Sequence, residues 1–437
     1  MPKRSYWPWW SGAVSIEVLM KIGEEYTLTP RAMAQGGDAV GRISGMACFV
    51  SGALPGETVN VKITHVTNTY ARGTVVSILT PAPERVIPRV ANAPHMEWQY
   101  IASDAQLEFK RQILAEQLTY LGKLSDLPEI SAVAGSDSWH YRNSARLHGY
   151  GTHLGYRGEK SAHVIVVADD PLLQPALQLA VQHLREATLL HPPEPRTPWS
   201  VSLRLSETNG QIVAAISDLP NRIAIAIRDA WLRKSPNVIG VLMPYGVHEG
   251  EEAIQETHYG ITMNLGATTF FQVSLSAAKT LCDAVLAGLG DDISEWRIVD
   301  AFCGAGTFTL PLAQRAKRVI GIEEYAPAVA SGQQNAWTNG LENVEWYTEP
   351  VERGIAHVLE ADAIVLDPPR RGCHPETIMG ILRLMPKKVV YVSCHPGTLA
   401  RDLQLIVAGG YKVTAITCVD CFPQTAHVES VTVLERI

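Results

Sequence analysis

Residues 21–80 show short runs in which β-branched and apolar residues alternate with polar ones. Such runs cover residues 40–43, 46–50, 58–63 and 71–76, and Gly36-Gly37, Gly52 and Pro55-Gly56 separate them. About five short strands in some 60 residues predict a small β-barrel of the oligonucleotide-binding type.

The pattern changes twice after residue 80. A proline-rich stretch from Pro81 to Pro94 predicts a linker, and residues 103–122 repeat leucine and isoleucine at helical spacing before Gly122. Residues 135–260 mix strand-like runs, such as 212–216 and 238–242, with polar stretches. We therefore expect an α+β middle domain.

From about residue 265, short runs with apolar centres alternate with helical segments. The runs lie at 297–300, 319–323, 363–367 and 388–392. Strands that are apolar on both faces indicate a parallel sheet covered by helices on each side. The fold class is thus α/β, with a Rossmann-like domain at the C-terminus.

These patterns divide the chain into four segments. We predict an N-terminal extension over 1–20 and the barrel over 21–80. We predict a linker and middle domain over 81–264 and the Rossmann-like domain over 265–437, with helix 103–122 packed on the latter.

Composition narrows the class of protein. Of the residues, 46% are hydrophobic and 19% charged, as in ordinary globular proteins, and the formal net charge is -7. A chain this acidic is no uniformly basic nucleic-acid binder, so any RNA contact must use local basic surface. The 7 scattered cysteines form no disulfide framework, and no apolar run is long enough to cross a membrane. We expect a cytoplasmic, reduced protein.

Two strand ends in the last segment predict a cofactor site. Gly304-x-Gly306 follows the first strand, and Glu323 ends the second, where an acid can reach a ribose hydroxyl. The third glycine that dinucleotide sites use around pyrophosphate is missing, which favours a nucleoside cofactor such as S-adenosylmethionine. Asp367, before two prolines, places another carboxylate at the same edge.

The next strand ends at Cys394, and Glu429 lies in an otherwise apolar late strand. A cysteine and a carboxylate are the two groups that methylation of uracil at C5 requires, because C5 by itself is a poor nucleophile. A thiolate that adds to C6 makes C5 nucleophilic, and a base must then remove the C5 proton. Taken alone, Cys394 is more typical of a small buried apolar residue. Cys373, beside Asp367, is a second candidate nucleophile. Cys418-x-x-Cys421 has the spacing of half a zinc site, but a second pair is lacking and we predict no metal.

The C-terminal motifs together resemble the RNA uracil-5 methyltransferase family that acts on ribosomal and transfer RNA. The matching pieces are 270–273, 300–311, 321–323, 367–372, 393–394, 398–403 and 422–429. The predicted barrel is similar to the TRAM domain of many ribosomal-RNA members, and Tyr141-Arg142-Asn143 resembles the start of the family's middle domain.

The resemblance implies a role for each matching residue. Cys394 would be the nucleophile and Glu429 the base. The cofactor would be held by Gln272, Phe302, Gly304, Gly306, Thr307, Glu323 and Asp367. The expected RNA contacts are Arg370, Arg371 and Arg142.

Four positions depart from the family pattern. Asn is usual where Thr307, His395 and Ser274 stand. Many relatives also carry four cysteines for an iron–sulfur cluster. Here residues 86–100 contain none, and Asp170 replaces the fourth, so we predict no cluster.

The resulting hypothesis is a monomeric, S-adenosylmethionine-dependent enzyme that forms 5-methyluridine in RNA. The barrel favours large-subunit (23S) ribosomal RNA over transfer RNA. Two alternatives are left open: an RNA cytosine-5 methyltransferase, and a non-catalytic RNA-binding protein on a decayed methyltransferase scaffold.

Overall fold

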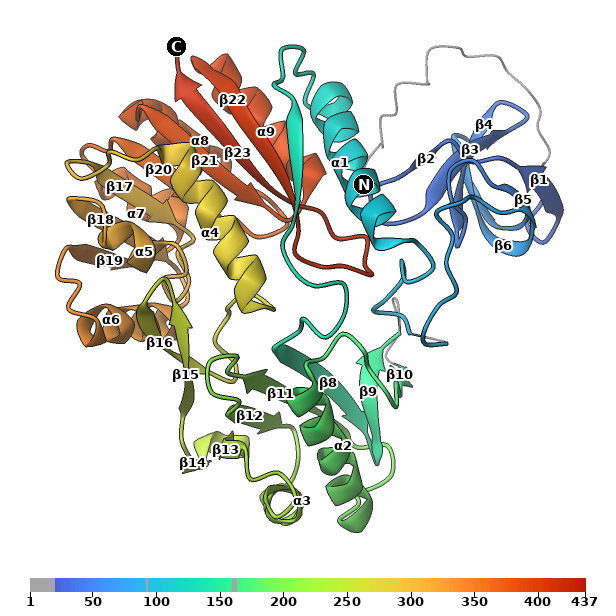
Figure 1. Cartoon of the computed structure of the whole chain (residues 1–437), viewed down its shortest axis with the longest axis horizontal. Coiled ribbons are helices and arrows are strands. Elements are labelled where there is room, and N and C mark those ends of the chain that lie inside the picture. The colour runs from blue at the N-terminus through green and yellow to red at the C-terminus, as the bar shows by residue number, and fades with distance from the viewer. Residues whose placement is uncertain (1–19, 92, 159–162) are drawn as a thin grey trace.

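The chain folds into three sheet-based parts, shown in the computed structural model of Figure 1. The structure describes residues 20–91, 93–158 and 163–437. The predicted extension over 1–20 therefore lies outside the described residues except for Met20, which is buried in the barrel core.

The N-terminal part is a six-stranded sheet in the order β1-β5-β6-β4-β3-β2. Its strands are β1 (Glu25–Leu28), β2 (Ala32–Met33), β3 (Ala39–Ile43), β4 (Met46–Ser51), β5 (Thr58–Val66) and β6 (Tyr70–Thr80). Alternate residues of β5 point inward, so Val59, Val61 and Ile63 are at most 1% exposed. A Cβ at Gly73 would lie 2.3 Å from Val61 Cγ1, so only glycine lets β5 and β6 approach this closely.

A buried ion pair ties the linker to the barrel. Glu57 is fully buried, and its Oε2 accepts bonds from Arg85 Nη2 and Leu54 N, each at 2.8 Å. Burial alone would raise the pKa of Glu57, but Arg85 and the backbone amides hold it below its usual value. The Arg85 guanidinium also stacks 4.8 Å from the centre of the Tyr100 ring.

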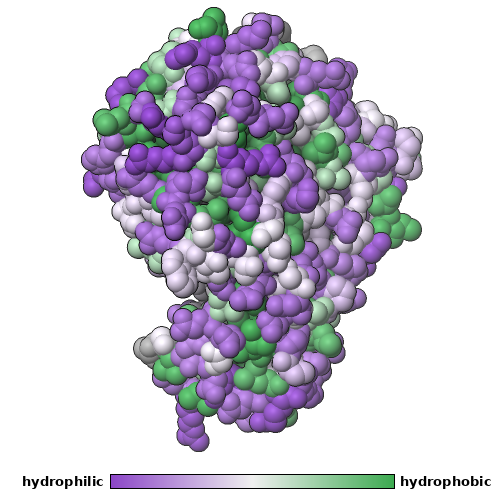
Figure 2. Space-filling view, turned by 60° about the vertical axis from the view of Figure 1, so that its left-hand side comes forward, coloured by the Kyte–Doolittle hydropathy of each residue, from purple (hydrophilic) through white to green (hydrophobic). Residues whose placement is uncertain are grey.

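The middle part has a seven-stranded sheet in the order β10-β9-β8-β11-β12-β13-β14. Its elements are β8 (Ser144–Tyr150), β9 (His153–Arg157), β10 (Val164–Ile165), α2 (Pro175–Leu190), β11 (Pro198–Leu205), β12 (Ile212–Ser217), α3 (Asn221–Leu232), β13 (Val238–Leu242), a 3-10 turn (Pro244–Gly246) and β14 (His248–Gly250). Helices α2 and α3 pack together, and the buried Trp231 ring nitrogen donates to Ala180 O at 2.8 Å. This part forms a separate lobe below a narrower waist (Figure 2).

The C-terminal part is an eight-stranded sheet in the order β19-β18-β17-β20-β21-β23-β22-β7. Its strands are β7 (Ile130–Ala134), β17 (Arg297–Ala301), β18 (Arg318–Glu323), β19 (Val344–Thr348), β20 (Ala363–Leu366), β21 (Lys388–Ser393), β22 (Tyr411–Asp420) and β23 (Glu429–Arg436). Strands β17 to β21 run parallel, and β23 is antiparallel to both its neighbours. The predicted α/β class with a Rossmann-like domain is confirmed.

Helices cover both faces of this sheet. They are α4 (Leu275–Leu289), α5 (Thr309–Ala313), α6 (Ala326–Thr338), α7 (Val351–His357), α8 (Pro375–Leu384) and α9 (Pro396–Ala408). One apolar core joins α7, α8 and α9 to residues such as Val299, and another joins α4 and α5 to Ile298. Successive strand residues therefore face opposite cores, which explains the fully apolar strands.

Two elements from the predicted linker and middle region pack into the C-terminal sheet. Helix α1 (Ser103–Glu116) continues into a π-helical turn (Gln117–Leu121), and its Ile113 and Leu114 join the core under α9. Strand β7 then pairs in parallel with β22 at the sheet edge. The sequence pattern did not predict that this strand belongs to the catalytic sheet.

A hairpin links the middle and C-terminal parts. Strands β15 (Ala253–His258) and β16 (Ile261–Gly266) pair with each other and dock on α6. The edge amides of β16 are satisfied by α6 side chains: Thr262 N donates to Asn339 Oδ1 at 2.9 Å, and Asn264 N to Asn335 Oδ1 at 2.8 Å. These bonds close an otherwise open strand edge.

The visible surface is mainly hydrophilic, with apolar side chains interspersed (Figure 2). In the part of the chain that the structure describes, no helix is both long enough and apolar enough to span a bilayer.

Candidate active site

The predicted site residues lie at one edge of the C-terminal sheet. Phe302 follows β17, Glu323 ends β18, Asp367 follows β20 and Cys394 follows β21. The register aligns Ala301 with Ile322 and Leu366. The carboxyl ends of parallel strands form the ligand-binding edge of open α/β sheets. The structure therefore brings these side chains to the same edge.

The turn after β17 has an unusual backbone. Phe302, Gly304 and Gly306 have φ of 67°, 55° and 98°, and the first of these is strained for a residue with a side chain. Hydrogen bonds from Phe302 N and Cys303 N to Ile322 O, at 2.9 and 3.1 Å, hold the turn against β18. A Cβ at Gly304 would meet nothing within 4 Å, so the backbone is open to a ligand there.

Glu323 is fixed beside this turn. Its Oε2 accepts from Gly304 N at 3.2 Å and its Oε1 from Tyr325 N at 2.8 Å. The carboxylate keeps further acceptor capacity after these two bonds. A carboxylate at a strand end beside an open glycine turn fits the ribose of a nucleoside cofactor.

Asp300 supports the turn from inside. It is fully buried, and its Oδ2 accepts from Thr309 Oγ1 at 2.5 Å, while Oδ1 has no hydrogen-bond partner. Burial raises the pKa of Asp300 to about 7. Sequence reasoning treated Asp300 only as part of a motif, and the structure shows that it organises the turn.

Gln272 lies shortly before α4, on a segment that the middle part holds. Its side chain is buried, and the next residue, Val273, accepts a bond from Asn143 N at 2.8 Å. Glu207 Oε1 accepts from Leu275 N at 2.6 Å and from Asn143 Nδ2 at 2.9 Å. The Asn of the Tyr-Arg-Asn motif thus anchors the start of α4.

Ser274, one of the departures from the family pattern, caps α4. Its Oγ accepts from Ala277 N at 3.0 Å and lies 2.8 Å from Ser136 Oγ. Serine and asparagine are about equally good N-caps. This replacement therefore preserves the helix start.

Cys394 directly follows β21, and Glu429 begins the neighbouring strand β23. Ser393 pairs with Ser430 in the antiparallel β21–β23 ladder, so the next residue of β21 faces the residue that begins β23. Glu429 is 7% exposed. All seven cysteines fall in the described part of the chain, and Cys394 is the one that is not buried.

Burial and nearby acidic groups raise the pKa values of Cys394, Asp367 and Glu429. Burial, Glu429 and Asp367 together raise the pKa of Cys394 to about 12, against the opposing effect of Arg370. Burial and Asp300 raise the pKa of the half-buried Asp367 to about 7. Burial and Asp367 raise the pKa of Glu429 well above its usual value. The thiol expected to react is therefore protonated in the free protein.

Helix α9 anchors the loop that carries Asp367. Thr398 Oγ1 donates to Arg370 O at 3.1 Å, and Cys373 N donates to Asp402 Oδ2 at 2.8 Å. Tyr391 OH donates to the same Asp402 oxygen at 2.7 Å. The motif over 398–403 thus supports the Asp-Pro-Pro loop.

Cys373, the second candidate nucleophile, is 5% exposed, and burial and Asp402 raise its pKa to about 12.

His395 replaces the family's asparagine at the start of α9 and caps this helix. Its Nδ1 accepts from Thr398 N at 3.2 Å. Its Nε2 lies 2.7 Å from Gln35 Nε2 of the barrel, in a contact whose donor depends on the tautomer and on the orientation of the amide. The departure therefore keeps the cap and adds a contact between barrel and catalytic sheet.

Two of the three arginines predicted to contact RNA lie near His427. Arg370 Nη2 lies 2.8 Å from His427 Nδ1. Burial, Arg370, Lys110 and Arg142 lower the pKa of His427 to about 4, so the ring is neutral and accepts from the guanidinium. The side chain of Arg371 is 75% exposed and lies 4.0 Å from Glu324.

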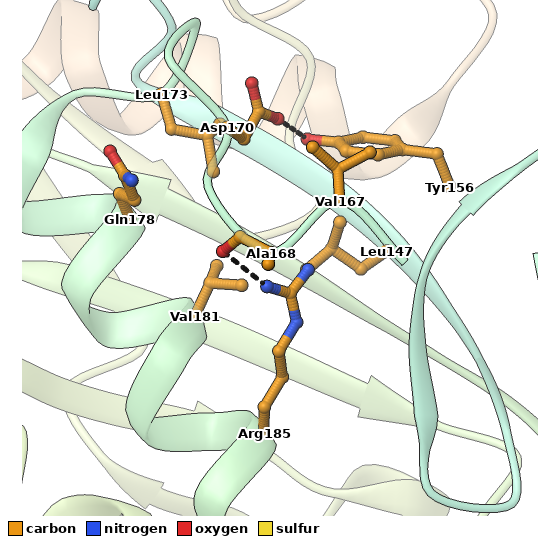
Figure 3. A pocket seen from close by; sticks show the side chains of 9 residues that line it. All are labelled: Leu147, Tyr156, Val167, Ala168, Asp170, Leu173, Gln178, Val181 and Arg185. Carbon is orange, nitrogen blue, oxygen red and sulfur yellow. Dashed lines mark hydrogen bonds between the residues drawn. The ribbon is translucent and has the colours of Figure 1, made fainter. Parts of the chain in front are cut away.

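Asp170, which replaces a cluster cysteine of many relatives, joins linker and middle part. Its Oδ2 lies 3.0 Å from His95 Nε2 and accepts from Tyr156 OH at 2.6 Å, and the two rings stack 3.9 Å apart. The small cavity beside it, about 10 Å³, is at the limit for one water molecule (Figure 3).

Among the described residues, no three His, Cys, Asp or Glu side chains gather as metal ligands; Cys418 and Cys421 are both buried.

Comparison with known proteins identifies two parts of the chain. Residues 21–76 match the TRAM domain model, and residues 354–437 match the model described as tRNA (Uracil-5-)-methyltransferase. The crystal structure of Pyrococcus abyssi tRNA (uracil-54, C5)-methyltransferase in complex with S-adenosyl-L-homocysteine superposes with a TM-score of 0.75. It covers 94% of this chain and 100% of that chain at 23% identity, and so shows the same fold.

Full-length relatives give the family. An uncharacterized RNA methyltransferase from Gloeobacter violaceus is 33% identical over 458 residues, which cover 95% of this chain and 97% of the relative. The 23S rRNA (uracil(1939)-C(5))-methyltransferase RlmD of Methylococcus capsulatus is 33% identical over 433 residues, which cover 93% and 96%. The chain therefore belongs to the S-adenosylmethionine-dependent RNA uracil-5 methyltransferase family.

Proposed function

We propose that this enzyme methylates C5 of a uridine in 23S ribosomal RNA through a covalent bond between Cys394 Sγ and C6. One observation carries the proposal. The β21–β23 register sets the half-exposed Cys394 against Glu429, and Asp367 follows the adjacent strand β20. A nucleophile and a separate base on opposite strands can act on neighbouring atoms of one pyrimidine ring.

The proposed reaction uses each group once. Cys394 first loses its thiol proton to solvent. The thiolate then adds to C6, and the electron pair of the C5–C6 bond moves into the ring to give an enolate. C5 then takes the methyl group. Glu429 removes the C5 proton, and the C6–S bond breaks to restore the double bond and the thiolate. Glu429 takes this proton in its ionised form, and its raised pKa makes that carboxylate a stronger base than an ordinary glutamate.

S-adenosylmethionine supplies the methyl group, and the residues at the sheet edge fit this nucleoside. We propose that Glu323 binds the ribose hydroxyls of the cofactor, and that the turn of Gly304 and Gly306 lets the cofactor approach the backbone closely. The remaining predicted cofactor contacts are Gln272, Phe302, Thr307 and Asp367. The open space beyond Gly304 and the unused acceptor capacity of Glu323 support this assignment.

The RNA contacts are assigned to Arg370, Arg371 and Arg142. A base inside a duplex cannot reach a thiol at a strand end, so the uridine must lie in a loop or flip out of the stack. The TRAM domain and the ribosomal-RNA substrate named for the Methylococcus relative favour ribosomal over transfer RNA. We propose that the enzyme acts in the cytoplasm as a monomer without an obligatory protein partner.

Transfer of labelled methyl from S-adenosylmethionine to unmodified ribosomal and transfer RNA tests the proposal. We expect label in 5-methyluridine of 23S ribosomal RNA. Label in transfer RNA alone would refute the proposed substrate, and label in 5-methylcytidine would refute uracil as the methylated nucleobase. Absence of label, together with no cofactor binding by calorimetry, would favour a decayed scaffold.

Two variants test the chemistry. Cys394→Ala should abolish transfer and keep cofactor binding, because the thiol acts only on RNA. Glu429→Gln should accumulate a protein–RNA adduct that migrates slowly on a denaturing gel. Turnover by Cys394→Ala would rule out the covalent route, and absence of the adduct band would rule out Glu429 as the base.

A further inference from the structure

The loop that precedes Glu429 is held from outside the catalytic domain. It runs over residues 421–428, between the end of β22 at Asp420 and the start of β23 at Glu429. Gln424 in its middle has φ of 69°, a strained conformation for a residue with a side chain. Such a conformation persists only where surrounding contacts fix it. The contacts that do so come from helix α1 and the linker before it.

Gln106 of α1 binds this strained residue at two points. Its Nε2 donates to Gln424 Oε1 at 3.0 Å, and its Oε1 accepts from Gln424 N at 2.7 Å. Gln106 is fully buried, and its Nε2 also donates to Ile101 O at 2.8 Å. Trp98 N of the linker donates to Gln424 O at 3.0 Å. Both backbone polar groups of Gln424 are therefore held by residues far away in sequence.

Lys110, one helical turn further along α1, lies on the same face and binds the end of β22 and the start of the loop. It is 0% exposed, and its Nζ donates to Asp420 Oδ1 at 2.6 Å and to Phe422 O at 3.0 Å. A buried ion pair gains little stability over well-packed apolar residues, because both charges lose their water. The pair thus contributes a defined position and a charge more than stability.

This charge lies close enough to act on the proposed base. Lys110 and Arg370 both oppose the rise in the pKa of Glu429 that burial and Asp367 cause. The same loop also carries His427, which holds Arg370. A shift of the loop would therefore move the base and disturb one of its two counter-charges.

We propose that Gln106 and Lys110 are positioning residues for removal of the C5 proton: they hold loop 421–428 so that Glu429 faces the carbon that has taken the methyl group. The inference rests on the proposed function, because it takes Glu429 as the base. It assigns to α1, which lies outside the Rossmann-like domain, a role in the last chemical step.

The test separates formation of the covalent adduct from its breakdown. Gln106→Met and Lys110→Met keep the approximate volume and remove the contacts to the loop. Wild type and variants receive S-adenosylmethionine and the transcript, ribosomal or transfer, that the wild type labels. In single turnover, we expect adduct formation within about twofold of wild type. Release of 5-methyluridine should slow by about tenfold to a hundredfold, as for a misplaced catalytic group, so that the adduct accumulates.

Arg111→Met is the matched control. It removes a positive charge from the next position of α1, where the side chain pairs with Glu108 of its own helix. We expect both steps to remain at wild-type rates. Lys110→Met leaves Asp420 buried without its partner, which can impair folding. The double variant Lys110→Met/Asp420→Asn removes that charge, and it replaces the single variant in the test if the single variant has a lowered melting temperature.

The outcomes distinguish the two proposals. If both steps slow equally in the folded variants, or neither slows, the positioning role is wrong. Glu429→Gln runs in parallel as the reference for a lost base. If it accumulates adduct and the α1 variants do not, only the further inference fails. If it does not accumulate adduct, the proposed chemistry itself fails.

Discussion

The raised pKa of Cys394 gives a direct prediction for its reactivity in the free enzyme. Six of the seven cysteines are buried, so a small alkylating reagent should modify Cys394 first. Burial, Glu429 and Asp367 raise its pKa to about 12, from an ordinary value of 9.0. Alkylation requires the thiolate, so the reaction should be slow and strongly dependent on pH.

The magnitude follows from the thiolate population. At pH 8, a thiol with a pKa of about 12 is ionised to roughly one part in ten thousand, a thousandfold less than an ordinary thiol. A more basic thiolate is also the better nucleophile, which offsets some twentyfold of this difference. Iodoacetamide should therefore modify Cys394 roughly fiftyfold more slowly than a free cysteine. The rate should rise about tenfold per pH unit up to pH 10.

Two variants should move this rate in opposite directions. Glu429→Gln removes a negative neighbour and should speed alkylation, and the difference should grow with pH as Glu429 ionises in the wild type. Arg370→Met removes the opposing positive charge and should slow it. The rate is followed by mass spectrometry of the peptide that contains Cys394. A plateau below pH 9 in the wild type, or the same direction in both variants, would refute this electrostatic account.

Three further substitutions test the framework of the site. Burial raises the pKa of Asp300 to about 7, so the folded state binds the proton of this carboxyl more tightly than the unfolded chain does. The free energy of unfolding therefore falls as pH rises from about 4 to 7. Asp300→Asn should therefore stabilise by at most about 4 kcal/mol at pH 8 and by almost nothing at pH 4 in urea unfolding. Asp170→Ala leaves Tyr156 OH and His95 without their partner and should cost about 2–4 kcal/mol; a loss under 0.5 kcal/mol would contradict this. His395→Asn should keep the α9 cap and methylation within about twofold, whereas His395→Leu should lose about 1 kcal/mol of stability.

The sequence predicted the parts of the fold that depend on local periodicity. Runs such as 319–323 and 388–392 are apolar because each strand is covered on both faces, and they form β18 and β21 as expected. The same rule placed Glu323, Asp367 and Cys394 at strand ends, and strand ends in a parallel sheet share an edge. The convergence of these residues therefore followed from topology alone.

Contacts between distant segments could not be predicted in this way. Strand β7 carries no signal that it pairs with β22, because an edge strand of five residues has no periodicity to mark its partner. The contact of Gln35 with His395 joins residues 360 positions apart. Lys110 lies in an amphipathic helix, where a lysine normally indicates the solvated face. Its burial follows only from Asp420, which the tertiary fold brings to it.

These long-range contacts share one arrangement. The catalytic edge carries the reacting groups, but three of the segments around it are held by other parts of the chain. Asn143 and Glu207 of the middle part hold the segment after Gln272, the barrel reaches the start of α9, and α1 holds the loop before Glu429. The barrel, the middle part and α1 therefore all support the site from outside the Rossmann-like domain. Separating the Rossmann-like domain would therefore leave its strand ends in place but release the loop that precedes Glu429. We expect the isolated domain to keep most of its affinity for the cofactor and to lose most of its methylation activity.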